Sequence, residues 1–380
     1  MLQFLRTLAR VLLPMSTAVF FIFGIGLSRP APAQDFQSEM DLLFNIVCQQ
    51  GGPGCNSLGA AGGPGGQFEV QNIGLPPAIG QHLQNLRCDA YCDQIGGTAA
   101  DRMAFESLNV FFSPDYQNKD KEEAVEAGFE SNLVGFTAGI ERSMERGVIG
   151  GALNLSRLTG DFDHNGGDFK QESIGGLLYG SYYPTHNSFI DGVIGLAHEG
   201  YDLDRTVVAI GQTFGSATGD TSGLEFQGSL SAGYDFRIDN FSIGPRVGIQ
   251  YLRTELSDFA ETGSPLALHY EDQVKDSLKS TLGFEASVAL CTDFGMVVPQ
   301  VNAAYVHEFL NDRRTIHVTA TDGSPLDFVT DPPDRDYFKV GGGVVLVLPN
   351  GISPYLNYSA EFGNRYEEVQ TVSAGVSFEL

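Results

Sequence analysis

The sequence lacks tryptophan, has few basic residues, and has no apolar run of membrane-helix length after its first 33 residues. Its 22 Lys and Arg stand against 47 Asp and Glu, a formal net charge of −25. This balance argues against nucleic acid as a partner, because phosphates need a basic surface. A transmembrane helix needs about 20 apolar residues, so no internal one is predicted. Mean hydropathy near zero still permits membrane strands, in which only alternate residues face lipid.

Known catalytic motifs are also missing. No GxSxG elbow, Walker loop, HExxH or dinucleotide-binding fingerprint occurs. A protease or phospholipase with a loop-borne site is the enzyme alternative, but no Ser/His/Asn or Asp/His pattern supports it. We therefore expect no enzymatic activity, no catalytic residue and no cofactor. We interpret the seven histidines as scattered surface residues: His82, His164, His186, His198, His269, His307 and His317.

The N-terminus has the pattern of a secretory signal. Arg6 and Arg10 form its positive region, and the apolar core runs over Val11–Leu27. Small residues before Gln34 predict cleavage between Ala33 and Gln34. An uncleaved anchor helix is the alternative. With no cysteine near the site, a lipoprotein is not expected.

Four of the five cysteines lie in one short region: Cys48, Cys55, Cys88 and Cys92. An even number in an exported segment predicts two disulfides, with three possible connectivities. We favour the nearest-neighbour pairs, Cys48–Cys55 and Cys88–Cys92. A zinc site is the alternative, but the CxxC pairs of structural zinc sites are absent. The fifth cysteine, Cys291, is either a free thiol or the partner of one of these four.

Residues 34–105 are too rich in glycine to bury a sizeable core. Gly59–Gly66 is a flexible linker. Pro77–Arg87 is predicted as one short helix, because Ile79, Leu83 and Leu86 have helical spacing. The region is therefore expected to be partly helical and held by disulfides.

From residue 106 onward, apolar and polar residues alternate in twelve segments, as in strands with one apolar face. A tilted strand of about 9 to 11 residues spans a bilayer, and every segment but the first is long enough. The predicted strands are Leu108–Phe112, Asn132–Glu141, Gly147–Leu158, Phe169–Tyr183, Ser188–Leu203, Gly223–Arg237, Phe241–Leu256, Ser277–Leu290, Met296–Phe309, Tyr337–Leu348, Ile352–Phe362 and Val369–Leu380.

The last segment shows the alternation clearly. Val372, Val376, Phe378 and Leu380 share one face, and small or polar residues fill the other. A soluble antiparallel barrel also alternates, with its apolar face inside. Here the aromatics gather on the apolar face, which predicts lipid outside and a polar lumen. Glycines on the expected lumen face relieve crowding: Gly135, Gly233, Gly248, Gly283 and Gly375.

The connections alternate between short and long, as periplasmic turns and outer loops do. The long ones are Ser113–Ser131, Thr159–Asp168, Asp204–Ser222, Ser257–Asp276 and Leu310–Asp336. The short ones are Arg142–Arg146, Pro184–Asn187, Ile238–Asn240, Cys291–Gly295 and Pro349–Gly351, and only Gly363–Glu368 breaks the contrast. With twelve strands, both ends of the barrel lie on the periplasmic side.

Two groups of charged residues could carry a function. Asp161–Glu172 fits the calcium-loop pattern D-x-[DN]-x-[DN]-G-x5-E, although strands flank it and outer hairpins also favour Asp, Asn and Gly. The second group lies on the expected lumen face, where it can line a narrow pore or hold a plug helix. Because both signs are present, we favour pairing between strands. These residues are Glu225, Asp235, Arg237, Arg246, Lys279, Glu285, Glu308 and Glu361.

Three motifs near the C-terminus carry a family resemblance. They are the Gly-rich strand Lys339-Val-Gly-Gly-Gly-Val, the turn at Asn350-Gly351, and Tyr355-Leu-Asn-Tyr-Ser-Ala-Glu-Phe-Gly363, all before Ser373-Ala-Gly-Val. Ala232-Gly-Tyr-Asp-Phe-Arg237 fits the same pattern. From Asn109 to Leu380 the chain resembles the autotransporter β-domain, the C-terminal translocator of type V secretion.

The resemblance implies a twelve-stranded barrel in the bacterial outer membrane, in contact with its lipid. It also implies insertion by the barrel-assembly machinery with periplasmic chaperones, and export of an N-terminal passenger, with a helix threading the lumen. Val372, Val376, Phe378 and Leu380 then form the C-terminal assembly signal, although Leu380 stands where the family usually has Phe or Trp. The expected passenger is short, about 70 residues, and shows no repeat.

We therefore predict an all-β protein: a twelve-stranded antiparallel transmembrane β-barrel with a short, partly helical, disulfide-bearing N-terminal segment. Residues 1–33 are the signal peptide, residues 34–105 the passenger or plug, and residues 106–380 the barrel. The predicted function of this monomer is to insert in the outer membrane and translocate or anchor its own N-terminal segment. The alternative is a structural, adhesive or porin-like barrel in which that segment is a periplasmic or luminal plug.

Overall fold

The computed structural model of the protein describes residues 79–80, 82–84, 107–122, 127–209, 212–310, 312–330 and 334–380. Residues 79–80 and 82–84 are helical, within the predicted helix Pro77–Arg87, and we call them the lumen segment. None of the residues that the structure describes forms a helix with the length and hydropathy of a membrane span. The predicted signal cleavage site and the four N-terminal cysteines lie outside these residues: Ala33, Gln34, Cys48, Cys55, Cys88 and Cys92.

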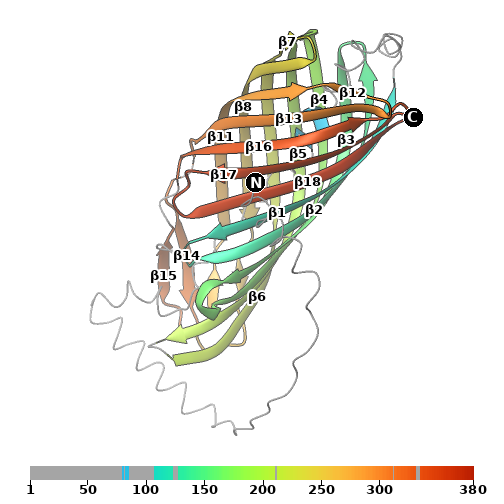
Figure 1. Cartoon of the computed structure of the whole chain (residues 1–380). Helices are drawn as coiled ribbons and strands as arrows, with labels where there is room; N and C mark the ends of the chain where they lie inside the picture. Colours follow the sequence, from blue (N-terminus) through green and yellow to red (C-terminus); the bar gives the residue numbers. More distant parts are fainter. Residues whose placement is uncertain are drawn as a thin grey trace, which may run out of the picture. The chain divides into compact units, whose positions relative to one another are not determined.

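Fourteen strands form one antiparallel sheet that closes into a barrel (Figure 1). Two are short continuations: β7 (Phe236–Ile238) follows β6 (Gln212–Tyr234), and β12 (Leu290–Thr292) follows β11 (Gln273–Val288). The others are β1 (Leu108–Lys121), β2 (Phe129–Met144), β3 (Gly147–Phe162), β4 (Gly167–Thr185), β5 (Ser188–Ala209), β8 (Phe241–Leu256), β13 (Gly295–Glu308), β16 (Asp336–Val347), β17 (Ile352–Phe362) and β18 (Glu367–Glu379). Pairing of β18 with β1 and of β8 with β11 completes the ring. The predicted twelve-stranded barrel is confirmed.

The outer face of the barrel is apolar and exposed. Leu153, Leu178 and Leu196 are 68%, 63% and 65% exposed, whereas their chain neighbours Asn154 and Tyr179 are buried on the lumen side. The period of two in a strand produces this division. The predicted inside-out pattern is therefore confirmed, and the outer face matches a wall that meets lipid.

Tyrosine hydroxyls mark the edge of the apolar band on the side of the long connections. Tyr251 donates to Asp276 at 2.6 Å and Tyr358 to Gln370 at 3.1 Å, each across to the neighbouring strand. Tyr305 donates to Asp336 in the same way. Aromatic residues whose polar end meets water are typical of the membrane interface of such barrels. Residues beyond these tyrosines lie outside the apolar band.

The two ends of the barrel differ, as predicted. At one end, which we call the turn end, the connections are short, and Leu380 N donates to Leu108 O at 2.9 Å where β18 meets β1. At the other, the loop end, the strands run further than predicted. β1 reaches Lys121, whereas the sequence predicts its end at Phe112. The predicted loop Thr159–Asp168 is reduced to the 3-10 turn η4 (Asp163–Asn165).

This misplacement of the strand ends has a physical cause. Main-chain pairing continues past the lipid band, but there both faces of the strand can carry polar residues. The alternation therefore stops before the strand does. Most of the predicted loop Asp204–Ser222 belongs to β5 and β6 for this reason.

A second sheet of four short strands lies at the loop end, and we call it the cap sheet. It consists of β9 (Phe259–Ala260), β10 (Leu268–Tyr270), β14 (Thr315–Ala320) and β15 (Pro325–Val329), in the order β15-β14-β10-β9. In Figure 1, β14 and β15 lie at the end of the barrel opposite the C-terminus. The two connections that form this sheet, Ser257–Asp276 and Leu310–Asp336, were expected to be plain loops.

Several lumen-facing rings lie directly over a glycine of the next strand. A Cβ at Gly139 would come within 2.2 Å of Phe111, and one at Gly375 within 2.5 Å of Tyr355. Only glycine leaves room for these rings against the wall. The same arrangement recurs at Gly150 with Tyr179, Gly160 with Phe169 and Gly233 with Phe189.

Candidate functional site in the barrel lumen

Two apolar side chains pack the lumen segment against the inner wall. Ile79 and Leu83 are 0% and 1% exposed. Residues four apart in a helix share one face, so both side chains reach the same part of the wall. The buried cluster that they complete consists of Phe111, Ala152, Leu177, Tyr179 and Val193. The barrel thus offers an apolar seat for the lumen segment.

His82 adds a polar anchor beside this seat. Its Nε2 lies 2.8 Å from Oε2 of Glu141 on β2, and both side chains are buried. Tyr179 donates to the same oxygen at 2.9 Å, and Asn109 donates to Oε1 at 3.3 Å. The imidazole also stacks on Phe111 with ring centroids 3.9 Å apart. A carboxylate with three donors is well satisfied, and loss of His82 would remove one of them.

The lumen segment also reaches the opposite wall. Gln84 Nε2 donates to Gln300 Oε1 on β13 at 3.1 Å, and Gln300 Nε2 donates to Asn357 Oδ1 on β17 at 3.1 Å. Strands β13 and β17 lie across the ring from β3 and β4, which contribute to the apolar seat. The lumen segment therefore spans the pore and occupies it.

Charged side chains elsewhere in the lumen pair between strands, as predicted. Arg246 lies 2.5 Å from Asp235 and 3.2 Å from Glu285. Glu308 accepts a hydrogen bond from Ser277 at 2.6 Å, and Glu225 accepts one from Thr254 at 3.2 Å. Arg246 thus pairs with carboxylates, whereas Glu308 and Glu225 accept hydrogen bonds from hydroxyls of the neighbouring strand.

The cap sheet packs its apolar face onto the lumen-facing wall at the loop end. Phe259 and Tyr270 stack with centroids 4.6 Å apart, and Tyr270 is fully buried. The wall side of this core consists of Phe129, Leu133, Leu158, Phe162, Phe169, Tyr201, Leu203 and Leu256, and the cap side adds Leu268, Ile316, Val318 and Phe328. A shared core of this size holds the cap sheet against the barrel.

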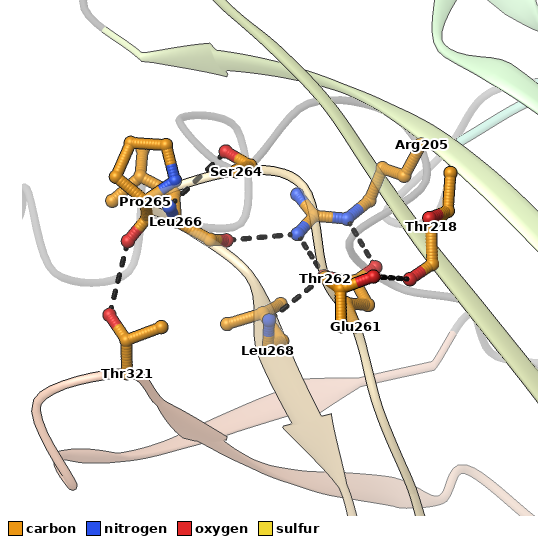
Figure 2. A network of polar contacts seen from close by, with 9 residues as sticks. All are labelled: Arg205, Thr218, Glu261, Thr262, Ser264, Pro265, Leu266, Leu268 and Thr321. Carbon is orange, nitrogen blue, oxygen red and sulfur yellow. Dashed lines mark hydrogen bonds and ion pairs between the residues drawn. The ribbon is translucent and has the colours of Figure 1, made fainter. Parts of the chain in front are cut away.

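An ion pair with no exposed surface joins the cap sheet to β5 (Figure 2). Arg205 donates through Nε to Glu261 Oε1 at 2.9 Å and through Nη2 to Glu261 Oε2 at 2.6 Å. The same Nη2 donates to Leu266 O at 3.1 Å, and Leu268 N donates to Glu261 Oε2 at 2.9 Å. Figure 2 also shows Thr218 of β6 paired with Thr262, which directly follows Glu261. Two-pronged pairing of Arg with a carboxylate fixes geometry as well as charge.

Arg205 stays charged although it is buried. Burial alone would lower the pKa of its guanidinium, but the hydrogen bond and charge of Glu261, with Tyr270 nearby, raise that pKa above its ordinary value. Burial also raises the pKa of the Tyr270 hydroxyl. The guanidinium therefore keeps its charge across the physiological pH range.

The residues of the predicted C-terminal signal lie on the outer face of β18. Phe378 contacts Phe112 of β1 with ring centroids 6.4 Å apart, and Val372 and Val376 pair in register with Tyr116 and Phe112. Leu380 is 74% exposed. Whether they act as an assembly signal stays a prediction.

The calcium pattern is not gathered into a site. Asp161 lies in β3 opposite Asp168, whereas Glu172 lies further along β4, 3.5 Å from Arg157. Within the described ranges, no three His, Cys, Asp or Glu side chains are placed to hold a metal ion. Cys291 is an exposed free thiol in β12.

The residues that anchor the lumen segment and the cap sheet were not predicted from the sequence. His82 was interpreted as a surface residue, which is wrong, because it is 1% exposed. Glu141, Arg205 and Glu261 were not singled out either. Their partners are distant in sequence, and only the helical spacing of Ile79 and Leu83 gave a signal near His82.

A family model described as the autotransporter beta-domain matches residues 110–359, more than half of the chain. The chain belongs to the autotransporter β-domain family. Its barrel is similar in fold to the translocator domain of autotransporter NalP from Neisseria meningitidis, with TM-score 0.59 and 18% identity, over 80% of this chain and 97% of that one. It is also similar to the beta domain of the Bordetella autotransporter BrkA, with TM-score 0.55 and 16% identity, over 72% of this chain and 100% of that one.

Two curated relatives share the autotransporter region. Putative uncharacterized protein YaiT of Escherichia coli (strain K12) is 23% identical over 65% of this chain and 24% of its own length. Outer membrane protein B of Rickettsia prowazekii (strain Madrid E) is 24% identical over 62% of this chain and 15% of its own length. The chain thus spans less than a quarter of the length of these relatives.

The protein is an outer-membrane autotransporter barrel. Its family is one of translocator barrels and not of enzymes. The alternative of a structural, adhesive or porin-like barrel with a plug and no role in secretion is not favoured.

Proposed function

We propose that the barrel translocates the segment that precedes it and then retains residues 79–84 in its lumen. The observation that carries this proposal is the lumen segment itself, seated on Phe111 and Tyr179 and bonded to Glu141 and Gln300 on opposite walls. A segment that only moves through the lumen during export does not need a complementary binding site on the wall. A chain that stops in the pore needs both an apolar contact and satisfied polar groups.

Protease treatment of intact cells tests this proposal. An epitope inserted beside Cys55 should be cut from outside if the preceding segment has been exported. An epitope in the η4 turn is the exposed control, and one at Glu145-Arg146 in a turn-end connection is the protected control. Full protection of the Cys55 epitope, with the η4 epitope cut, would contradict export and support a periplasmic plug.

We further propose that maturation removes residues 1–33 and that residues 34–105 carry two disulfides. The small residues before Gln34 and the even cysteine count support this. The mature monomer is delivered by periplasmic chaperones and inserted by the barrel-assembly machinery into the lipid of the outer membrane. Peptide mass spectrometry of the purified protein should find Gln34 as the N-terminus and the bonds Cys48–Cys55 and Cys88–Cys92. An N-terminus at Met1 would contradict the processing proposal.

A further inference from the structure

The cap sheet crosses the mouth of the barrel. Its strands come from the β8–β11 and β13–β16 connections, yet their apolar side chains share one buried cluster with β2, β3, β4 and β5 as well as with the end of β8. Around the closed ring, β11 and β13 stand opposite β2 and β3. Connections that leave one wall and pack on the facing wall must pass over the opening between them. The lumen is thus covered at the loop end, independently of the lumen segment.

The face of the cap sheet that contacts the wall is apolar and buried, as a barrier to water and solutes requires. Tyr270, Ile316 and Val318 are 0%, 3% and 1% exposed, so the contact with the wall is dry. A dry contact this deep excludes water from the gap between cap and wall. The polar part of the lumen begins two residues closer to the turn end than Leu158, at the paired residues Ser156 and Ser173, which face inward.

Arg205 and Glu261 hold the cap at its β9 edge, which follows β8 after two residues. The rest of the contact is apolar and non-directional, whereas this pair fixes β9 to β5 through two parallel hydrogen bonds. Thr218 and Thr262 exchange both main-chain hydrogen bonds at 2.8 Å next to it. We propose that the cap sheet is a permeability seal over the outer mouth of the barrel, latched to the wall by the Arg205–Glu261 ion pair.

A cysteine beneath the cap reports whether the seal is closed. Ser156 is buried on the lumen face of β3, two residues inward of Leu158 in the cap core, and its hydroxyl has no partner among the described residues. Intact cells that produce the full chain with Ser156→Cys and Cys291→Ser would be treated with a polyethylene-glycol maleimide too large for porins. Peptide mass spectrometry then gives the rate of modification at position 156. With the cap intact, we expect this rate to be far below that of His164→Cys in the exposed η4 turn.

Three variants test the latch. Arg205→Leu and Glu261→Leu should each raise the labelling rate by about ten- to a hundredfold, because each leaves one buried charge without a partner. The double variant should return to within a few-fold of the parent, since an apolar pair of similar volume leaves no buried charge. Arg157→Leu, which breaks the exposed pair with Glu172 on the outside of the same wall, is the matched control and should not change the rate. Heat-modifiable gel mobility shows that each barrel is folded.

An engineered disulfide between the cap sheet and β6, which can be formed and reduced, completes the test. The paired Thr218 and Thr262 have the separation of a hydrogen-bonded antiparallel pair, about 5.5 Å between Cα atoms, which a disulfide can bridge. Adding Thr218→Cys and Thr262→Cys to Arg205→Leu should suppress labelling under oxidising conditions, and reductant should restore it. Labelling of the parent at the rate of the η4 cysteine would overturn the seal. Equal rates in the single and double leucine variants would overturn the latch. If the preceding segment is exported as proposed above, it leaves the lumen beside the cap sheet, and the seal is then the contact of the cap with the wall around that segment.

Discussion

At the scale of single residues, the inner wall depends on large rings fitted against glycines. Tyr355 on β17 covers Gly375 on β18, and its hydroxyl lies 2.5 Å from Ser113 on β1. One aromatic side chain thereby ties together three consecutive strands at the closing seam of the barrel. A side chain at Gly375 would push the ring out of this position.

Gly375→Val should therefore destabilise the barrel by about 1–3 kcal/mol through overpacking. The temperature at which the folded band converts to the unfolded band in gel electrophoresis measures this. Gly192→Val is the matched control, because Gly192 faces outward and a Cβ there would meet nothing within 4 Å. An equal drop in both variants would contradict the role given to the ring.

The sequence was informative about such residues only where their role follows from strand periodicity. Gly233 and Gly375 were placed correctly on the lumen face, because a period of two assigns every residue to one side. His82, Arg205 and Glu261 were not identified as anchors. A buried charge looks like a surface charge until its partner is known, and Arg205 and Glu261 are far apart in sequence.

At the scale of elements, the twelve strands were predictable and their outer ends were not. The apolar alternation ends with the lipid band. Strand β5 nevertheless continues to Ala209, and β6 already begins at Gln212. The cap sheet could not be predicted, since β10 and β14 pair with each other from two separate connections. Their apolar residues contact the far wall, and this contact leaves no local pattern.

Strand β18 carries a prediction of its own. Deleting Phe378–Leu380 removes the pairs Val110–Phe378 and Ile352–Phe378, and the bond from Leu380 N to Leu108 O, so the seam loses its turn-end register. The truncated protein should fail to reach the outer membrane in heat-modifiable form. Leu380→Phe keeps every one of these main-chain contacts and should assemble at least as well as the parent. Membrane fractionation of both variants measures this, and normal insertion of the truncated chain would refute it.

At the scale of the whole molecule, the barrel is apolar outside, polar inside, and occupied in two places. The lumen segment lies beside Glu141 near the turn end, and the cap sheet covers the loop end. The inside-out division was predictable, because composition differs between the two faces of every strand. The two occupants were not, apart from the short helix that contains Ile79.

The inside-out division predicts where a charge is tolerated. Leu178→Arg places a cation on the lipid face within the apolar band, where it should lower the free energy of unfolding by about 2–4 kcal/mol. Asp202→Arg is exposed on the same face beyond the band and should change it by about 1 kcal/mol or less. Urea unfolding of the barrel in lipid bilayers gives both values. A smaller loss for Leu178→Arg than for Asp202→Arg would mean that the lipid face has been misassigned.

The seam between β1 and β18 has a consequence for the order of folding. The two strands that close the ring are its first and last in the chain, and the register joins Val110 to Phe378. Contacts between such distant residues form late, because the entropy of closing the intervening chain opposes them until many other contacts exist. During synthesis and export, β1 therefore has no partner on one edge, and an unpaired edge invites aggregation. The unpaired edge of β1 must therefore be protected until β18 is available to pair with it.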